Sequence, residues 1–217
     1  MTDYSRLEIT VDVFDLKRQP ARPIANLPVR DFITATLAEF REVAYLGNQP
    51  EQYQVIDMTS GAVLDNEAAI GVQIKAGAQL ALIDRPLAQP QGAESVTTDV
   101  YLRETLSGEV YKLHWSPAII GRSDENIRGE ALLITNLESL PRGLRISRRH
   151  AQITEQDGAF YIKQLSRNPT KIKDTAHREI YLDNESYQLK HGDQIRLERS
   201  GTELTFIERN KIGQANE

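Results

Sequence analysis

The chain has 217 residues, of which 40% are hydrophobic and 26% are charged, and its formal net charge is −5. This balance is typical of a globular protein with one large domain or two small ones. Cysteine is absent, and none of the four histidines lies within four residues of another, which excludes thiolate metal sites and a helical zinc pair. The sequence shows no secretory signal and no apolar run of roughly 18 residues, so we expect a cytoplasmic location and no membrane insertion.

Residues 5–84 have the pattern of a small α+β domain. Apolar and polar residues alternate from Leu7 to Val13, which predicts a strand. A polar turn at 17–22 and a short returning strand at 23–25 follow. An apolar stripe that begins after Pro28 and continues to Ala44 at three- and four-residue spacing predicts a helix, and Gly47-Asn48 is suited to end it. Further strands are predicted over 53–58, 63–64 and 80–83.

This order of strand, strand, helix, strand, short strand, strand resembles the ubiquitin-like (β-grasp) domain. The closing segment, in which Lys75-Ala76-Gly77 precedes the last strand, is similar to the YukD-like ubiquitin relatives linked to type VII secretion. A conjugation tail of paired glycines is missing, since Leu82-Ile83 continues into Asp84-Arg85-Pro86. The resemblance therefore implies a docking module and argues against a conjugated modifier, and a plain packing module is the alternative.

Residues 85–98 contain Pro86, Pro90 and Gly92 with little apolar periodicity, and we predict a linker there. Residues 99–208 consist of short strand-like runs separated by turn residues, which predicts an all-β sandwich or barrel. The predicted strands are 100–104, 110–115, 118–120, 132–135, 151–154, 160–165, 180–182, 194–197 and 204–207. Residues 209–217 form a polar tail.

Three short motifs in this second part carry polar side chains at the ends of predicted strands. Gly121-Arg122-Ser123 follows an apolar run, Ser147-Arg148-Arg149-His150 precedes one, and Ser166-Arg167-Asn168-Pro169-Thr170 follows another. Arginine, serine and asparagine together can surround one tetrahedral anion. The stretch 141–150 holds four arginines and no acid, and such local positive charge on an acidic chain favours a specific anion site.

These motifs, in this order and followed by the turn Gly192-Asp193, resemble the forkhead-associated (FHA) domain, a β-sandwich that reads phosphothreonine peptides. The resemblance implies that six residues form the phosphopeptide site: Arg122 and Ser147 at the phosphate, Arg148 as added charge, Asn168 at the peptide backbone, and Ser166 and Thr170 in its loop. It implies structural roles for Gly121, His150, Gly192 and Asp193. The expected function is a bacterial, non-enzymatic adaptor without a cofactor, which binds a phosphothreonine-containing protein downstream of a Ser/Thr kinase.

The sequence departs from the FHA pattern in two places. Pro169 stands where the family most often has glycine, and proline lacks the N–H that could bind a peptide carbonyl. The segment 123–146 is long for the family and includes Asn126–Glu130. We expect these departures to alter how flanking peptide residues are read without removing Arg122, Ser147 or Asn168.

Other functions fit parts of the sequence. Ser147 and His150 could suggest a nucleophile and base, but residues three apart on a strand face opposite ways, and no nucleophile elbow accompanies them. The arginines could bind nucleic acid, which the acidic chain disfavours. Both domains could instead form a phosphate-independent scaffold in an assembly such as type VII secretion. Thr97 and Thr98 resemble the phosphorylated segment of some bacterial FHA regulators, although paired linker threonines are more often plain solvated residues.

Overall fold

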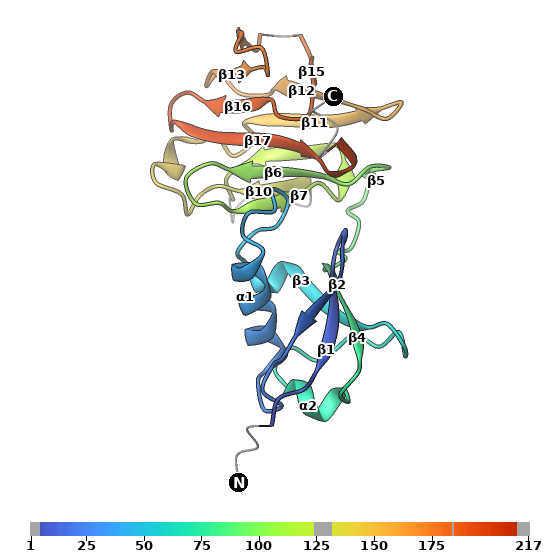
Figure 1. Cartoon of the computed structure of the whole chain (residues 1–217). Helices are drawn as coiled ribbons and strands as arrows, with labels where there is room; N and C mark the ends of the chain where they lie inside the picture. The colour runs from blue at the N-terminus through green and yellow to red at the C-terminus, as the bar shows by residue number, and fades with distance from the viewer. Residues whose placement is uncertain (1–4, 124–131, 184, 212–217) are drawn as a thin grey trace. The chain divides into compact units, whose positions relative to one another are not determined.

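The structure, a computed structural model, describes residues 5–123, 132–183 and 185–211 (Figure 1). The chain divides into two compact units, Met1–Pro86 and Leu87–Glu217. Each unit has its own sheet structure. The helices in the described part of the chain are all too short or too polar to span a membrane.

The first unit is a four-stranded mixed sheet with one helix of three turns. The elements are β1 (Ile9–Val13), β2 (Leu16–Ala21), α1 (Val29–Glu39), η1 (Pro50–Gln52), β3 (Tyr53–Asp57), α2 (Ile70–Gln73) and β4 (Gln79–Asp84). The strand order is β2-β1-β4-β3, and only the central pair, β1 and β4, is parallel. Apolar side chains of α1, including Phe32, Ile33 and Leu37, are buried together with Val11, Val55 and Leu82 of the sheet.

Several sequence predictions in this unit were wrong. The short strand predicted at 23–25 is only an isolated bridge between Ile24 and Arg6. Residues 17–22, predicted as a turn, lie largely within β2, because the chain already reverses after Val13, where Phe14 has a positive φ of 54°. Pro20 is tolerated in β2 because this strand lies at the edge of the sheet. The predicted helix ends at Glu39 instead of continuing to Ala44, and residues 63–64 form only an isolated bridge between Val63 and Ile56.

The second unit is a β-sandwich. One sheet has the order β10-β9-β11-β12-β15 and the other β14-β13-β16-β17-β6-β7, while β5 pairs with β8. The strands are β5 (Glu94–Ser95), β6 (Val100–Glu104), β7 (Val110–Lys112), β8 (Trp115–Ser116), β9 (Ala118–Gly121), β10 (Leu133–Asn136), β11 (Ala151–Gln156), β12 (Ala159–Gln164), β13 (Thr170–Lys173), β14 (Glu179–Tyr181), β15 (Tyr187–Leu189), β16 (Gln194–Leu197) and β17 (Thr202–Glu208).

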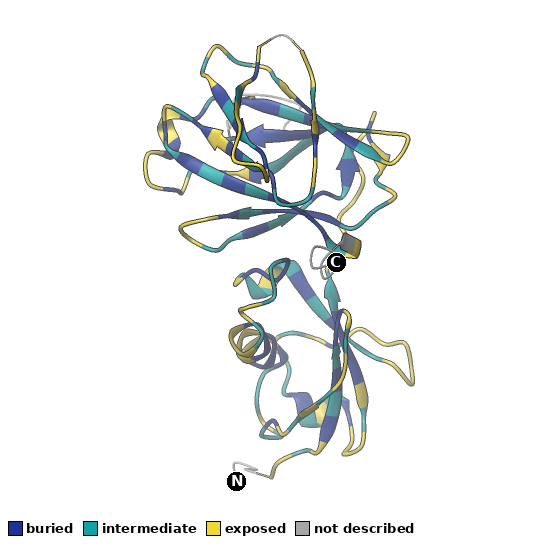
Figure 2. Ribbon diagram, turned by 45° about the horizontal axis from the view of Figure 1, so that its top comes forward, coloured by how far each residue is buried: buried dark blue, intermediate teal, exposed yellow. Residues whose placement is uncertain are grey.

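The core of the sandwich lies between the two sheets. Ile120, Ile153 and Ile162 come from one sheet, and Leu102, Ile195 and Leu204 from the other. Buried and exposed residues alternate along several of these strands, while many of the turns between them are exposed (Figure 2). This alternation is the period-two pattern expected for strands with one face in a core.

The second unit also differs from the sequence predictions in detail. Glu94–Ser95, placed in the linker, forms β5 against Trp115–Ser116, so this end of the segment is part of the sandwich unit. Strands β13 and β15 were not predicted from the sequence. Thr170–Lys173 contains a single strongly apolar residue, Ile172, and Tyr187–Leu189 has only three residues, so neither shows a clear strand pattern. Of the predicted tail, Arg209–Lys211 forms a short 3-10 turn, and residues 212–217 lie outside the described residues. Residues 126–130, part of the segment predicted to be long for the family, also lie outside the described residues.

Candidate functional site

Strand pairing brings the three polar motifs to one end of the sandwich. Ile120 of β9 pairs with Ala151 of β11, so the segment after β9 lies beside the segment before β11. Ala151 also pairs with Gln164 at the end of β12, which brings the loop 165–169 to the same end. Three segments that are separate in the sequence therefore share one edge of the sandwich.

Gly121 permits the first two loops to approach each other closely. A Cβ atom at this position would lie 2.1 Å from the Arg148 carbonyl oxygen and 3.0 Å from the Ser147 carbonyl oxygen. Both atoms belong to the backbone, so they cannot move aside as the end of a flexible side chain could. The glycine is therefore required by the contact between the Arg122 loop and the Ser147 loop.

Arg122 is half-buried and held by backbone carbonyls. Its Nε donates a hydrogen bond to the Ile146 carbonyl at 3.0 Å, and its Nη1 lies 3.5 Å from the Ser123 carbonyl. Its backbone N–H donates to the Ser147 carbonyl at 3.3 Å. The guanidinium is thus oriented beside the Ser147 loop, which reduces the conformational entropy lost when an anion binds.

Ser147 and Asn168 are joined directly by their side chains. Asn168 Nδ2 donates to Ser147 Oγ at 2.9 Å and to the Arg145 carbonyl at 3.4 Å. The carbonyl can only accept, which fixes the orientation of the amide group. Both amide hydrogens are therefore used within the protein. Within the part of the chain that the structure describes, Asn168 Oδ1 stays available to accept and the Ser147 hydroxyl stays available to donate.

His150 connects the loops from within the protein. It is 1% exposed, and its backbone N–H donates to the Ile120 carbonyl at 2.9 Å. Its carbonyl accepts from the N–H groups of Leu165 and Ser166, and its Nδ1 accepts from the Ser147 N–H at 3.4 Å. Burial lowers the pKa of His150 to about 4, against a weak opposing effect of the Pro169 carbonyl, so the imidazole is neutral at pH 7.

This geometry also bears on the nucleophile hypothesis. Residues 148–149 form a turn, and Ser147 lies outside any strand, in contrast to the strand assumed from the sequence. It is the backbone N–H of Ser147 that reaches His150, whereas the hydroxyl contacts Asn168. The pair therefore lacks the bond between hydroxyl and imidazole that activates a serine nucleophile.

The remaining predicted site residues have different environments. Arg148 is exposed, and Ser166 is half-buried, with its Oγ accepting from the Asn168 N–H at 3.2 Å. Thr170 is 0% exposed and begins β13, where its N–H donates to the Gln164 side chain. Its Oγ1 has no hydrogen-bond partner among the described residues. The structure thus places Thr170 in the core, where its side chain cannot touch a peptide.

Gly192 and Asp193 lie at the other end of β16 from the Asn168 loop, where they shape a turn. Gly192 has a φ of 89°, and Asp193 accepts hydrogen bonds from the Lys190 N–H and the Tyr187 hydroxyl. Burial raises the pKa of Asp193 and, together with the Asp193 carboxylate, raises that of Tyr187 to about 12. These residues stabilise this turn, away from the candidate site.

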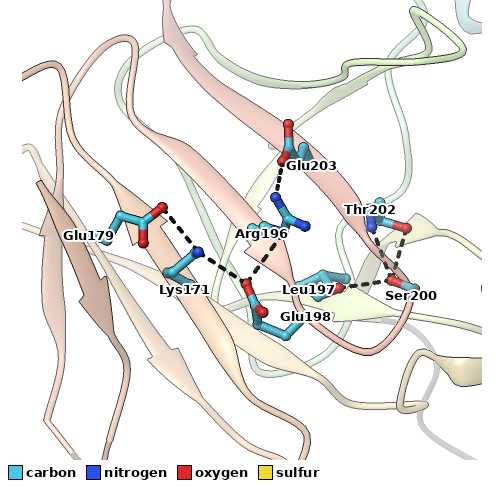
Figure 3. A network of polar contacts seen from close by, with 8 residues as sticks. All are labelled: Lys171, Glu179, Arg196, Leu197, Glu198, Ser200, Thr202 and Glu203. Carbon is cyan, nitrogen blue, oxygen red and sulfur yellow. Dashed lines mark hydrogen bonds and ion pairs between the residues drawn. The ribbon is translucent and has the colours of Figure 1, made fainter. Parts of the chain in front are cut away.

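A polar network supports the Asn168 loop from the second sheet, and no pattern in the sequence predicted it. Lys171 Nζ lies 3.0 Å from Glu179 Oε1 and 3.5 Å from Glu198 Oε1 (Figure 3). Arg196 pairs with both Glu198 and Glu203 (Figure 3). The backbone N–H of Glu198 donates to the Pro169 carbonyl at 3.1 Å, which links this network to the residue after Asn168.

Thr97 lies away from these loops. Its backbone N–H donates to the Glu155 carboxylate at 3.0 Å, and its hydroxyl also bonds to that carboxylate. Glu155 is four residues from Ala151 along β11, toward the opposite end of the sandwich from His150. Thr97 is exposed and Thr98 is half-buried.

A two-sheet β-sandwich with three polar loops gathered at one end is the class of module that this part of the chain forms. Residues 118–198 match the family model of the FHA domain, and this stretch is an FHA domain. A comparison with curated proteins gives no match.

Solved structures similar to the chain include other FHA domains. One, from a study of phosphothreonine-dependent FHA domain interactions, is 25% identical over 52% of this chain and 98% of its own, with a TM-score of 0.39. Mycobacterium tuberculosis EmbR, solved with a low-affinity phosphopeptide, is 25% identical over 51% of this chain and 24% of its own, with a TM-score of 0.38. The FhaA FHA domain, complexed with the intracellular domain of Rv3910, is 26% identical over 49% and 98%, with a TM-score of 0.36.

Proposed function

We propose that this protein is a phosphothreonine-peptide-binding adaptor in Ser/Thr-kinase signalling. The observation that carries the proposal is the direct bond between Asn168 and Ser147 beside a carbonyl-anchored Arg122. Three different loops supply these residues, and each contributes a distinct function: a fixed cation, a hydroxyl donor and an amide acceptor. The match of residues 118–198 to the FHA domain supports the same function.

The chemistry of a phosphothreonine side chain fits this set. Such a group carries about −1.5 to −2 charges and three strong acceptor oxygens. Arg122 supplies charge-assisted hydrogen bonds, the Ser147 hydroxyl supplies another, and Arg148 adds positive charge. Bonds of this kind contribute about 1.5–3 kcal/mol each, which is suited to a reversible, micromolar complex.

The state of Asn168 specifies how the peptide backbone would be held. Because Nδ2 is already bonded to Ser147 and to the Arg145 carbonyl, the remaining group of the side chain is Oδ1, an acceptor. We infer that it accepts a hydrogen bond from a peptide N–H. Pro169 has no N–H to add, so the contact at this loop depends on Asn168.

We propose that the first unit, residues 5–84, is a ubiquitin-like (β-grasp) docking module. A helix that follows a β1–β2 hairpin, with β1 parallel to β4 at the sheet centre, supports this assignment. The partner expected from the sequence is a component of a bacterial assembly such as type VII secretion. A pull-down with residues 1–86 and with the full chain would test whether this unit alone retains the partner.

The phosphothreonine function can be tested with peptide libraries and matched variants of the full chain. Phosphothreonine, phosphoserine and unphosphorylated libraries are compared for the wild type and for Arg122→Ala. Lys190→Ala serves as control, because it removes one exposed positive charge beside the Gly192–Asp193 turn. We expect phosphothreonine binding that weakens by at least about tenfold in Arg122→Ala and is kept in the control.

Two results would contradict the proposal. Equal binding of phosphorylated and unphosphorylated peptides would exclude phosphate recognition. A folded wild type that binds none of the libraries would favour the phosphate-independent scaffold. Circular dichroism and thermal unfolding of each variant establish that a loss of binding is not a loss of folding.

A further inference from the structure

The loop that carries Asn168 is anchored to a turn of the second sheet. This turn, residues 198–201, joins β16 to β17, and the Glu198 N–H at its start donates to the Pro169 carbonyl at 3.1 Å. Proline fixes its own φ and restricts the residue before it, so an anchored Pro169 carbonyl also limits the motion of Asn168. The orientation of the Asn168 side chain therefore depends on where the turn places this N–H.

Hydrogen bonds within the turn fix its backbone. Ser200 Oγ donates to the Leu197 carbonyl at 3.1 Å, and the Thr202 N–H donates to Ser200 Oγ at 3.2 Å (Figure 3). The Gly201 N–H donates to the same Leu197 carbonyl at 2.9 Å. The turn is thus closed by its own bonds, and Glu198 is the residue that connects it to its surroundings.

The Glu198 side chain holds the turn against two neighbouring strands, β13 and β16. Its Oε1 atom is buried and lies 3.5 Å from Lys171 Nζ and 3.3 Å from Arg196 Nε (Figure 3). The Lys171 side chain is only 12% exposed, so its ammonium group depends on carboxylate partners to offset its lost hydration. One carboxylate therefore bridges two cations, and these ion pairs fix residue 198 relative to the start of β13, which directly follows Pro169.

We propose that Glu198 is a positioning residue for peptide binding. Its ion pairs hold the N–H that anchors Pro169, and the anchored Pro169 keeps the Asn168 amide in its binding orientation before the peptide arrives. Such pre-organisation lowers the conformational entropy lost on binding. This inference rests on the proposed phosphothreonine function, and it assigns part of the affinity to a side chain of the second sheet that acts through the loop.

The first measurement follows the anchoring bond itself and needs no peptide. Amide hydrogen exchange is measured by NMR for the wild type, Glu198→Gln and Asp99→Asn. Asp99 is a matched control, because its carboxylate also bridges two cations, Lys112 at 2.9 Å and Arg209 at 2.6 Å, near the opposite end of β17. After correction for intrinsic rates, the amide of residue 198 should exchange about threefold faster or more in Glu198→Gln alone, while the β16 amides keep their protection.

The second measurement places the effect in the Asn168 loop. Affinity for one phosphothreonine peptide is measured by fluorescence polarisation for single and double variants of the full chain. Glu198→Gln should weaken binding about twofold to tenfold, and Asp99→Asn should bind as the wild type does. The loss should disappear in an Asn168→Ala background, because the side chain that Glu198 positions is then missing. It should persist in an Arg148→Ala background, because Arg148 belongs to the Ser147 loop.

The outcomes separate this proposal from the phosphothreonine function. If the wild type binds the peptide but Glu198→Gln fails to change either the exchange of residue 198 or the affinity, the positioning role is overturned and the phosphothreonine function stands. An affinity loss that is equally large in the Asn168→Ala background overturns it as well, because Glu198 would then act elsewhere. If no phosphothreonine peptide binds to the folded wild type, the phosphothreonine function fails and the positioning role falls with it.

Discussion

Protonation of His150 should destabilise the FHA domain as the pH falls from neutral to about 4. The imidazole is buried, and this burial lowers its pKa from the ordinary 6.5 to about 4. In the unfolded chain the histidine regains its ordinary pKa, so acid favours the unfolded state. The stabilisation is present in full above pH 6.5 and is lost as the pH falls through this range toward 4.

The size of the effect follows from the same pKa difference. One pKa unit corresponds to about 1.4 kcal/mol, so a lowering from 6.5 to about 4 corresponds to about 3 kcal/mol. This is a large part of the roughly 5–15 kcal/mol by which a typical domain is stable. Protonation of Nδ1 also removes the acceptor for the Ser147 N–H, so peptide affinity should fall over the same pH range.

The assay is urea unfolding at several pH values between 7 and 4, for the wild type, His150→Asn and His177→Asn. An asparagine at 150 offers an acceptor oxygen near Nδ1 but does not titrate. His177 is exposed with a left-handed φ of 63°, which asparagine tolerates, so this variant is a matched control. The wild type and the control should lose about 3 kcal/mol relative to His150→Asn.

Asp193 titrates in the same experiment with the opposite sign. Its raised pKa gives a stabilisation that is present at low pH and lost as the pH rises, but it is common to all three proteins and cancels in the comparison. A proton NMR titration of the wild type needs no variant. A His150 pKa near 6.5, or equal pH slopes for wild type and His150→Asn, would refute the reasoning.

Three further predictions concern single residues. Gly121→Ala should destabilise the domain by about 1–3 kcal/mol and lower peptide affinity, because its Cβ would displace a carbonyl oxygen at 2.1 Å. Gly158→Ala should lower stability without lowering peptide affinity, because its Cβ would meet no atom within 4 Å but its φ is 76°. Urea unfolding with peptide titration separates these outcomes, and full affinity in Gly121→Ala would contradict the first. Asn168→Asp should weaken phosphopeptide binding about tenfold or more, because the new carboxylate cannot donate a hydrogen bond and repels phosphate. Titration calorimetry that gives wild-type affinity would count against the role of Asn168 in peptide binding. Thr170→Val should be neutral or stabilising, because it removes a buried hydroxyl that has no hydrogen-bond partner in residues 5–123, 132–183 and 185–211. A loss of stability above about 1 kcal/mol in urea unfolding would contradict this expectation.

The sequence predicted the sandwich and the position of the polar motifs at strand ends well where the signals were local. Val100–Glu104 and Gln194–Leu197 have the bounds expected from alternation, and Gly121-Arg122 follows a buried strand as expected. Local patterns failed where pairing decides the structure. Leu16–Ala21 is a strand because it pairs with β1 in spite of Pro20, and Thr170 is buried because β13 pairs with β16.

The sequence by itself determined which residue types can bind an anion and their order along the chain. It could not determine their bonding, because Arg122, Ser147 and Asn168 are brought together by the pairing of β9, β11 and β12. Only the tertiary structure decided that both amide hydrogens of Asn168 are bonded inside the protein and that His150 is buried and neutral. It also decided that the Glu198 N–H supports the Asn168 loop through the Pro169 carbonyl. Hydrogen bonds between distant segments depend on distances that local sequence patterns do not specify.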